Sequence, residues 1–506
     1  MKSLRLLLLS CVYVAFVDSA LAQAKNVLFV VVDDLKPVVG AYGQTQMVTP
    51  HMDALAASGT TFLNAHAQQA ICGPSRISFL TGKRPDATKV YDLSTFMRDV
   101  TPNTITLPEH FKANGYETVG MGKFFHMARK NDPQSWTLPF IEDKKLPYTA
   151  GFQKPVMKHY QSEEVRKTVS ELSEEAEHLE REDMQKEGLF PSFEALDIPD
   201  DAYPDGAMAV KSIELMKGFA ETDKPFFLAV GFHRPHLPFV APKKYWDLYD
   251  RTKIQVAEHQ GRAEGAPSMA YHKSGELQNY TDIPRNLDID HRLPKEKQQE
   301  LIHGYYASVS YVDAQIGKII AYMKESGLWE NTIIVLLGDH GWHLGDHGLW
   351  NKHTNFEQAT RTVLIIRSPD LPESVSNTSP VELIDIFPTV SQLAALSVPQ
   401  EVQGKSLLPI LTKKSTRIRE VAMSQYPRDA FMGYTVRSDR YRYTEWVKKS
   451  AVEKSAKFPQ KSSPDLELYD YSIDPLETRN LINDPKYAEI AKDLRAQLVK
   501  VYESSK

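Results

Sequence analysis

The stretch NVLFVVVDD, residues 26–34, joins a short apolar run to two adjacent aspartates. Its apolar part is continuous and rich in β-branched residues, which is typical of a parallel strand that is covered on both faces. Two later stretches have the same form, PFFLAV at 225–230 and TIIVLL at 332–337. We therefore predict that these three segments are buried parallel strands of one sheet.

Each of these apolar runs leads directly into polar residues. The first is followed by Asp33-Asp34, the second by Gly231-Phe232-His233 and the third by Gly338-Asp339-His340. In open α/β sheets the ligand crevice lies beyond the carboxyl ends of the strands. The sequence thus predicts that all three polar clusters meet at one site.

Helical patterns separate the predicted strands. Apolar residues recur at helical spacing in 50–58, 107–114 and 300–325, and glycine follows the first two segments. Alternation of such elements favours a doubly wound α/β domain. Residues 160–187 are rich in Glu and Lys, so we expect an exposed helical insertion whose charges face solvent.

The last fifth of the chain has a different pattern. After a polar stretch at 411–420, short strand-like runs and a terminal helix from about residue 485 predict a smaller domain with an antiparallel sheet. The expected strands are 433–436, 441–447 and 466–471. The expected division of the chain is a leader at 1–22, a catalytic domain at 23–414 and a C-terminal domain at 415–506.

The overall charge argues against binding to nucleic acid. The chain of 506 residues has 60 Lys and Arg against 65 Asp and Glu, a net charge of −5, whereas proteins that bind a phosphate backbone usually have a basic excess. A hydrophobic fraction of 42% is sufficient for a large core. We expect a globular protein without a nucleic-acid partner.

The first residues have the pattern of a secretory signal. MKSLR precedes the apolar run LLLLSCVYVAFV and the small-residue stretch SALAQA. The apolar run is shorter than the ~20 residues that span a bilayer, and no later segment qualifies. A lipoprotein modified at Cys11 is a weaker alternative. We expect a secreted or periplasmic protein without a membrane span.

Removal of this leader would leave Cys72 as the only cysteine, so no intrachain disulfide could form. Because Ser75–Leu80 should begin a helix, Cys72 is expected at a helix N-terminus, where backbone N–H groups favour an anion. An unmodified thiol there would have a lowered pKa and act as a nucleophile. A cysteine hydrolase and a small buried hydrophobic residue both stay open as alternatives.

The stretch Cys72-Gly73-Pro74-Ser75-Arg76, followed by ISFLTGKRP, resembles the C-x-P-S-R signature of the type I sulfatases. The resemblance extends over residues 25 to about 482. It includes NGYETVGMGKFFH, FFLAVGFHRPHLPF, GDHGWHLGDHGLWNKHTNF and SQYPR, which in order and spacing look like the iduronate-2-sulfatases.

The resemblance implies an alkaline-phosphatase-like sandwich with a large, mostly parallel central sheet flanked by helices, and a smaller C-terminal domain with an antiparallel sheet. It implies that Cys72 is converted to formylglycine (3-oxoalanine) by a formylglycine-generating or anaerobic sulfatase-maturating enzyme. It also implies one Ca²⁺ held by Asp33, Asp34, Asp339, His340 and the modified residue 72. His340 is less typical of calcium than the asparagine of many sulfatases.

Five further positions match family residues that hold or protonate the sulfate: Arg76, Lys123, His126, His233 and Lys352. In the mechanism that the resemblance implies, a hydroxyl of hydrated formylglycine attacks sulfur and His233 protonates the leaving sugar oxygen. His126 deprotonates the second hydroxyl. His236 has no such match and serves equally well in the loop or at the substrate rim. A zinc site at His343, His347 and His353 is not favoured, because they lie in a glycine-rich loop.

The implied substrate is a sulfated, often uronate-containing polysaccharide or its oligosaccharides, such as glycosaminoglycan fragments or algal ulvan. The charged insertion and an SQYPR loop are expected to line its pocket. Two alternatives stay open, a phosphonate or phosphate ester hydrolase and a non-catalytic calcium-dependent glycan-binding protein. The absence of a possible disulfide favours a bacterial source over a lysosomal one.

Overall fold

The computed structural model describes residues 24–126, 131–157, 159–175, 189–222, 224–453, 455–460 and 463–505. The predicted leader, including Cys11, lies outside these residues, and so does the part of the predicted insertion from 176 to 187. The described part of that insertion contains helix α6 (Glu163–Glu175).

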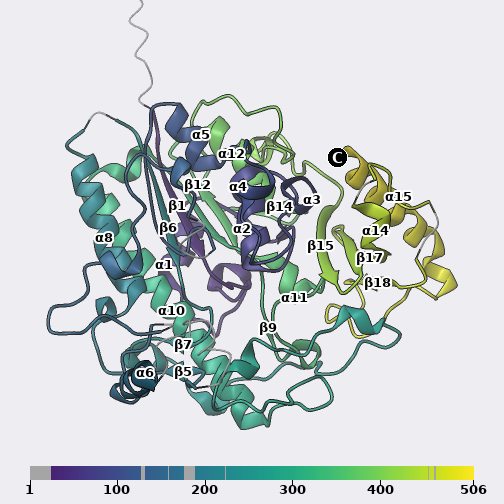
Figure 1. Cartoon of the computed structure of the whole chain (residues 1–506). Coiled ribbons are helices and arrows are strands. Elements are labelled where there is room, and N and C mark those ends of the chain that lie inside the picture. The colour runs from purple at the N-terminus through teal and green to yellow at the C-terminus, as the bar shows by residue number, and fades with distance from the viewer. Residues whose placement is uncertain are drawn as a thin grey trace, which may run out of the picture.

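A seven-stranded sheet forms the centre of the larger part of the molecule, in the order β13-β2-β12-β8-β1-β6-β4 (Figure 1). Strand β1 (Asn26–Val32) pairs in parallel with both β6 (Phe226–Phe232) and β8 (Thr332–Gly338). β4 (Glu117–Gly122) extends this arrangement beyond β6, whereas β12 (Leu364–Arg367) runs antiparallel to β8. The three predicted strands and the mostly parallel sheet are confirmed.

Both faces of this sheet are covered by helices, which explains why its strands are apolar at nearly every position. Because side chains alternate along a strand, Phe29 of β1 packs into one core cluster and Val30 into the other. The first cluster includes α2 (Cys72–Thr81), α5 (Leu107–Ala113) and α12 (Ile386–Leu393). The second includes α1 (Pro50–Ala57), α8 (Pro204–Phe219) and α10 (Lys295–Glu325).

The C-terminal part is a four-stranded antiparallel sheet covered on one face by helix α15 (Ala488–Ser504) (Figure 1). Its strands follow each other in sequence order: β15 (Ala422–Arg428), β16 (Phe431–Arg437), β17 (Tyr441–Lys448) and β18 (Leu466–Asp470). The predicted antiparallel sheet and terminal helix are confirmed.

The structure differs from the sequence-based expectations at several boundaries. α10 begins at Lys295, five residues before the predicted start, and α15 begins at Ala488 after a 3₁₀ turn at Pro485–Tyr487. The SQYPR segment is not a loop, because it lies in β15, which sequence analysis missed. Its proline is tolerated because β15 is an edge strand of its sheet.

The remaining elements are short and connect or flank these layers. They are β2 (Thr60–Phe62), β3 (Ala65–His66), β5 (Phe193–Glu194), β7 (Phe239–Val240), β9 (His343–Leu344), β10 (Trp350–Asn351), β11 (Arg361–Thr362), β13 (Val375–Asn377), β14 (Val381–Glu382), α3 (Pro85–Thr88), α4 (Met97–Val100), α9 (Lys243–Trp246), α11 (Glu357–Thr360), α13 (Leu408–Leu411) and α14 (Lys449–Val452). Among the described helices, none combines the length and the apolar character needed to cross a bilayer.

Candidate active site

The three predicted polar clusters follow the carboxyl ends of adjacent strands. Asp33 and Asp34 follow β1, His233 follows β6, and Asp339 follows β8. The backbone N–H of Asp34 donates to Asp339 Oδ1 at 2.9 Å, so the ends of β1 and β8 are joined directly. Asp33, Asp34 and Asp339 are fully buried. The site is therefore a polar pocket inside the protein rather than a surface patch.

Cys72 is the first residue of α2, so the helix starts three residues earlier than predicted. Its Sγ lies 3.4 Å from His340 Nε2, 3.7 Å from Lys123 Nζ and 3.8 Å from Asp34 Oδ1. Its exposed fraction is 1%. The fold thus places Cys72 in contact with predicted metal ligands that follow both β1 and β8.

The expectation of a lowered thiol pKa at Cys72 is wrong. Burial raises the pKa of this thiol well above its usual range, and the neighbouring Asp33 carboxylate adds to the effect, although Lys123 opposes it. Desolvation of the thiolate outweighs the helix N-terminus here. A raised pKa favours the protonated thiol, which is a weaker nucleophile than the thiolate.

Arg76 lies one helical turn after Cys72 and has no exposed surface. Its Nη2 donates to Asp33 Oδ1 at 2.8 Å and its Nε donates to Asp339 Oδ2 at 3.0 Å. Its Nη1 donates to the carbonyl oxygens of Lys123 and Phe124. The guanidinium group therefore ties α2, β1, β4 and β8 together beneath the site.

Lys123 and Lys352 supply two further cations. Lys123 Nζ pairs with Asp33, and Lys352 Nζ lies 3.0 Å from Asp34 Oδ2. Burial opposes the charged form of Lys352, but Asp34 and other neighbouring anions raise its pKa well above the usual range. Both ammonium groups are therefore charged.

Sequence analysis missed Glu276, which lies in the site. Its carboxylate is 3.1 Å from Lys352 Nζ and 3.0 Å from His236 Nε2. His236 Nε2 also lies 3.8 Å from Asp34 Oδ2, so His236 belongs to the site and not only to the loop. Glu276 lies in an irregular segment next to a 3₁₀ turn, where nothing in the sequence distinguishes it from other glutamates.

His126 and His233 border a cavity of about 270 Å³ beside Lys123. Burial lowers the pKa of His126 well below its usual range, and the Lys123 ammonium adds to the effect, so the ring is neutral. Phe125 and Phe140 form apolar parts of the cavity wall. The cavity adjoins the Lys123 ammonium.

The donor atoms around Cys72 fit a hard divalent cation. Cys72 belongs to two groups of potential metal ligands, and within each group the ligand atoms lie within 4.8 Å of one another. One group is Asp33, Asp34, Cys72 and His236, and the other is Cys72, Asp339 and His340. Burial raises the pKa of Asp34 well above its usual range, and repulsion from Asp33, Glu276 and Asp339 adds to it, although Lys352 opposes it. Several crowded carboxylates suit Ca²⁺ better than Zn²⁺.

The histidines of the glycine-rich loop form a separate cluster. His343 Nε2 lies 2.9 Å from Thr354 Oγ1. The ring of His347 stacks on that of Phe356, with 4.2 Å between the ring centroids. Among the described residues, no group of potential metal ligands includes His343, His347 or His353.

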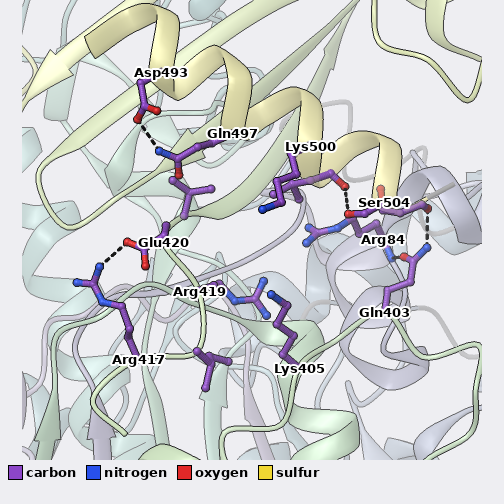
Figure 2. A pocket seen from close by; sticks show the side chains of 14 residues that line it. Arg84, Gln403, Lys405, Arg417, Arg419, Glu420, Asp493, Gln497, Lys500 and Ser504 are labelled. Atoms are coloured by element: carbon purple, nitrogen blue, oxygen red, sulfur yellow. Dashed lines mark hydrogen bonds and ion pairs between the residues drawn. The ribbon is translucent and has the colours of Figure 1, made fainter. Parts of the chain in front are cut away.

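A second cavity, of about 710 Å³, lies beyond the C-terminal end of α2, whereas Cys72 is at the N-terminal end of this helix. Figure 2 shows side chains of α15, among them Lys500, on one side of it and Arg417 and Arg419 on the other. The arginines are already paired: Arg84 with Glu382, Arg419 with Glu382 and Asp385, and Arg417 with Glu420 and Asp439. The arginines of this cavity are therefore held in ion pairs, and Cys72 is not among the residues that line it.

Comparisons with known proteins agree with this geometry. Residues 25–396 match the family model Sulfatase, and residues 345–504 match the model N-sulphoglucosamine sulphohydrolase, C-terminal. The chain is 33% identical to iduronate 2-sulfatase of Homo sapiens over 562 residues, with 96% of each chain covered. It is 31% identical to a sulfatase of Formosa agariphila over 491 residues, with 94% of this chain and 86% of that one covered.

The fold matches phosphonate monoester hydrolase from Silicibacter pomeroyi with a TM-score of 0.71, at 22% identity over 95% of this chain and 96% of that one. At this identity the match concerns the fold alone. The expected α/β fold and the resemblance to the iduronate-2-sulfatases are confirmed. The chain therefore belongs to the sulfatase family and is a sulfuric ester hydrolase.

Proposed function

We propose that this sulfatase removes sulfate esters from a sulfated, uronate-containing polysaccharide or its oligosaccharides, with formylglycine at position 72 and a bound Ca²⁺. The observation that carries the proposal is the convergence of Cys72, three buried carboxylates and three cations at the carboxyl edge of the sheet. The similarity to iduronate 2-sulfatase over nearly the whole chain supports a uronate-containing substrate.

Asp33, Asp34, Asp339 and His340 would hold the ion together with residue 72. The ion supplies positive charge for the sulfate oxygens, and the hydrated aldehyde at position 72 supplies a hydroxyl nucleophile. The three carboxylates are buried, and Arg76 links two of them, Asp33 and Asp339.

Lys123 and Lys352 bind the sulfate group in this proposal, and Arg76 holds the carboxylates beneath it. Negative charge on the sulfate oxygens must be neutralised before an ester oxygen can leave, which fixed cations in a buried site do efficiently. Lys123 Nζ lies 3.7 Å from Cys72 Sγ, so its ammonium is already beside the reacting position.

The two histidines divide the proton transfers. His233 donates a proton to the leaving sugar oxygen while the sulfur–oxygen bond breaks. His126, which is neutral, accepts a proton from the hydroxyl at position 72 when the sulfate is released. Both rings border the cavity beside Lys123, which gives the sugar a place on the same side as its proton donor.

Three further parts of the proposal concern the whole chain. Residues 1–22 direct secretion or periplasmic export in a bacterium, and a formylglycine-generating or anaerobic sulfatase-maturating enzyme converts Cys72. Residues 23–414 form the catalytic domain and residues 415–506 the smaller one. Support comes from the sequence patterns at the N-terminus and around Cys72, and from the four-stranded sheet that begins at Ala422.

The test is co-expression with a formylglycine-generating enzyme, followed by mass analysis of the peptide that contains residue 72. Conversion removes roughly 18 Da. Sulfate release is then measured on a panel of sulfated oligosaccharides with and without uronate, with Cys72→Ala as the control. We expect release that depends on conversion and on the uronate.

Three results would contradict parts of this proposal. Converted protein that turns over only the phosphate or phosphonate analogue would favour a phosphohydrolase. Converted protein that binds glycans tightly without turnover, also as Cys72→Ala, would favour a glycan-binding protein. Equal activity on neutral and uronate-containing sugars would reject the substrate class.

A further inference from the structure

A second cluster of ionisable side chains lies on the wall of the cavity at His233. Asp143 Oδ2 is 3.0 Å from His233 Nε2 and 3.2 Å from His159 Nε2, and the two imidazole rings are 4.3 Å apart. Asp143 is the first residue of a 3₁₀ turn between β4 and α6, and His159 directly precedes the charged insertion. Neither was predicted as a site residue.

The hydrogen bonds of His159 fix its tautomer. Arg234 Nη2 lies 3.1 Å from His159 Nδ1. A guanidinium group only donates hydrogen bonds, so Nδ1 must accept and Nε2 must carry the ring proton. His159 Nε2 therefore donates to Asp143 Oδ2. The direction of the chain of contacts is Arg234 to His159 to Asp143.

The same tautomer argues against a metal at this cluster, although two imidazoles and a carboxylate are a common ligand set. A metal would need the lone pair of His159 Nε2, and the proton would then move to Nδ1, where it would face the Arg234 guanidinium. The arrangement is a hydrogen-bonded carboxylate and not a metal site.

His233 contacts Asp143 through charge and not through a hydrogen bond. Its Nε2 is buried and makes no hydrogen bond of acceptable geometry within the described residues, although Asp143 Oδ2 is at ion-pair distance. The ring N–H is thus not directed at Asp143. The Asp143 carboxylate thus lies beside a ring that also borders the cavity next to Lys123.

We propose that Asp143, fixed by His159 and Arg234, is a positioning residue that orients His233 and stabilises the charge of its ring as the proton donor to the leaving sugar oxygen. This inference rests on the proposed function, in which His233 has that role. The proton moves from His233 Nε2 to the sugar oxygen as the sulfur–oxygen bond breaks, and Asp143 keeps its negative charge throughout.

The other charged groups near His233 have different contacts from those of Asp143. Asp205 accepts the backbone N–H groups of His233 and Arg234 and so holds the loop. Lys123, His126 and Glu142 line the same cavity as His233. Burial alone would raise the pKa of Asp143, but His233 and His159 lower it below its usual range, so it is ionised.

The first test measures the pKa of His233 directly, without turnover. Protein labelled with ¹⁵N-histidine is titrated by NMR, and the His233 signal is assigned by its loss in His233→Asn. Asp143→Asn should lower the pKa of His233 by about one unit, because an opposite charge at this distance favours the protonated ring. Asp247→Asn is the matched control, since Asp247 pairs with Lys243 on the exposed surface and does not line the cavity. Equal shifts in both variants would overturn the proposal.

The second test compares two leaving groups. A sugar sulfate needs a proton on its leaving oxygen, whereas an aryl sulfate with an acidic phenol hardly does. Asp143→Asn should lower kcat/KM on the sugar sulfate by about 10–100-fold and shift the alkaline limb of the pH profile to lower pH by about one unit, with less than about threefold loss on the aryl sulfate. Asp143→Glu should recover part of the loss.

Equal losses on both esters with an unchanged pH profile would mean that Asp143 is only structural and would overturn the inference. A wild-type enzyme that is converted at position 72 but releases sulfate from neither ester would reject the proposed function instead. In that case the NMR titration still decides whether Asp143 controls the protonation of His233.

Discussion

Replacement of Arg76 by methionine tests whether the guanidinium group holds the site together. Methionine has a similar length but no charge. In the variant, Asp339 would lose its 3.0 Å contact and keep the backbone N–H groups of Asp34 and His340, while Asp33 would keep Lys123. The change thus leaves one buried carboxylate poorly compensated rather than two.

The size of the effect follows from burial. Both Arg76 and Asp339 have no exposed surface, and removal of one partner of a buried ion pair costs about 3–5 kcal/mol. For a cooperative unit of roughly 400 residues, an unfolding entropy near 2.1 cal/mol/K per residue makes this a decrease in Tm of about 4–6 °C. Added Ca²⁺ should recover part of the loss, because the ion offers the carboxylates a countercharge.

The assay is thermal unfolding followed by tryptophan fluorescence, with and without Ca²⁺. Arg262→Met is the matched control, because Arg262 pairs with Asp290 at 3.3 Å while both side chains are at least 47% exposed. Such a pair contributes at most about 1 kcal/mol. A decrease in Tm for Arg76→Met no larger than that of Arg262→Met would refute the reasoning.

A Ca²⁺ concentration of a hundred times Kd contributes about 2.7 kcal/mol to the free energy of unfolding, so removal of the ion by a chelator should lower Tm by about 3 °C. The Tm of Asp34→Asn should respond less to the chelator. An equal response of both proteins would contradict the assignment of Asp34 as a ligand. In unconverted protein, the Cys72 thiol should react with iodoacetamide at pH 7 at least 100-fold faster after denaturation. The reason is that burial raises the pKa of this thiol and shields its sulfur from the reagent. Mass spectrometry measures the rate, and equal rates in folded and denatured protein would contradict the burial. Burial lowers the pKa of His66 to about 4 from about 6.5 in the unfolded chain. The neutral ring therefore contributes about 3 kcal/mol to the free energy of unfolding above pH 6.5, and this contribution is lost as the pH falls to about 4. The stability measured by urea unfolding should depend less on pH in His66→Gln than in the wild type, and an unchanged dependence would refute this.

Sequence analysis located the central strands because burial on both faces demands continuous apolar runs, which are rare and easily recognised. It located Asp33, Asp339 and Cys72 because they follow such runs or carry a distinctive motif. The start of α2 was placed three residues late, since Cys72-Gly73-Pro74 has low helix propensity and tertiary packing decides its conformation.

Glu276, Asp143 and His159 could not be predicted. Each lies in an irregular connection, and its role depends on which partner the fold brings to it: Lys352 for Glu276, His233 for Asp143 and Arg234 for His159. Such contacts leave no periodic pattern in the sequence. The thiol pKa of Cys72 was predicted in the wrong direction for the same reason, because burial is a property of the whole fold.

The strand order of the central sheet has a consequence for biosynthesis. β1 pairs with β8, and roughly 300 residues separate them in the chain, so the middle of the sheet cannot close until β8 has left the ribosome, about 15–60 s later at usual elongation rates. The other partner of the apolar stretch at 26–32 is β6, which is itself about 200 residues away in the chain. The C-terminal sheet, whose strands pair in sequence order, can form within seconds. The central sheet is therefore assembled from contacts between distant segments of the chain, and the C-terminal sheet from contacts between neighbouring ones.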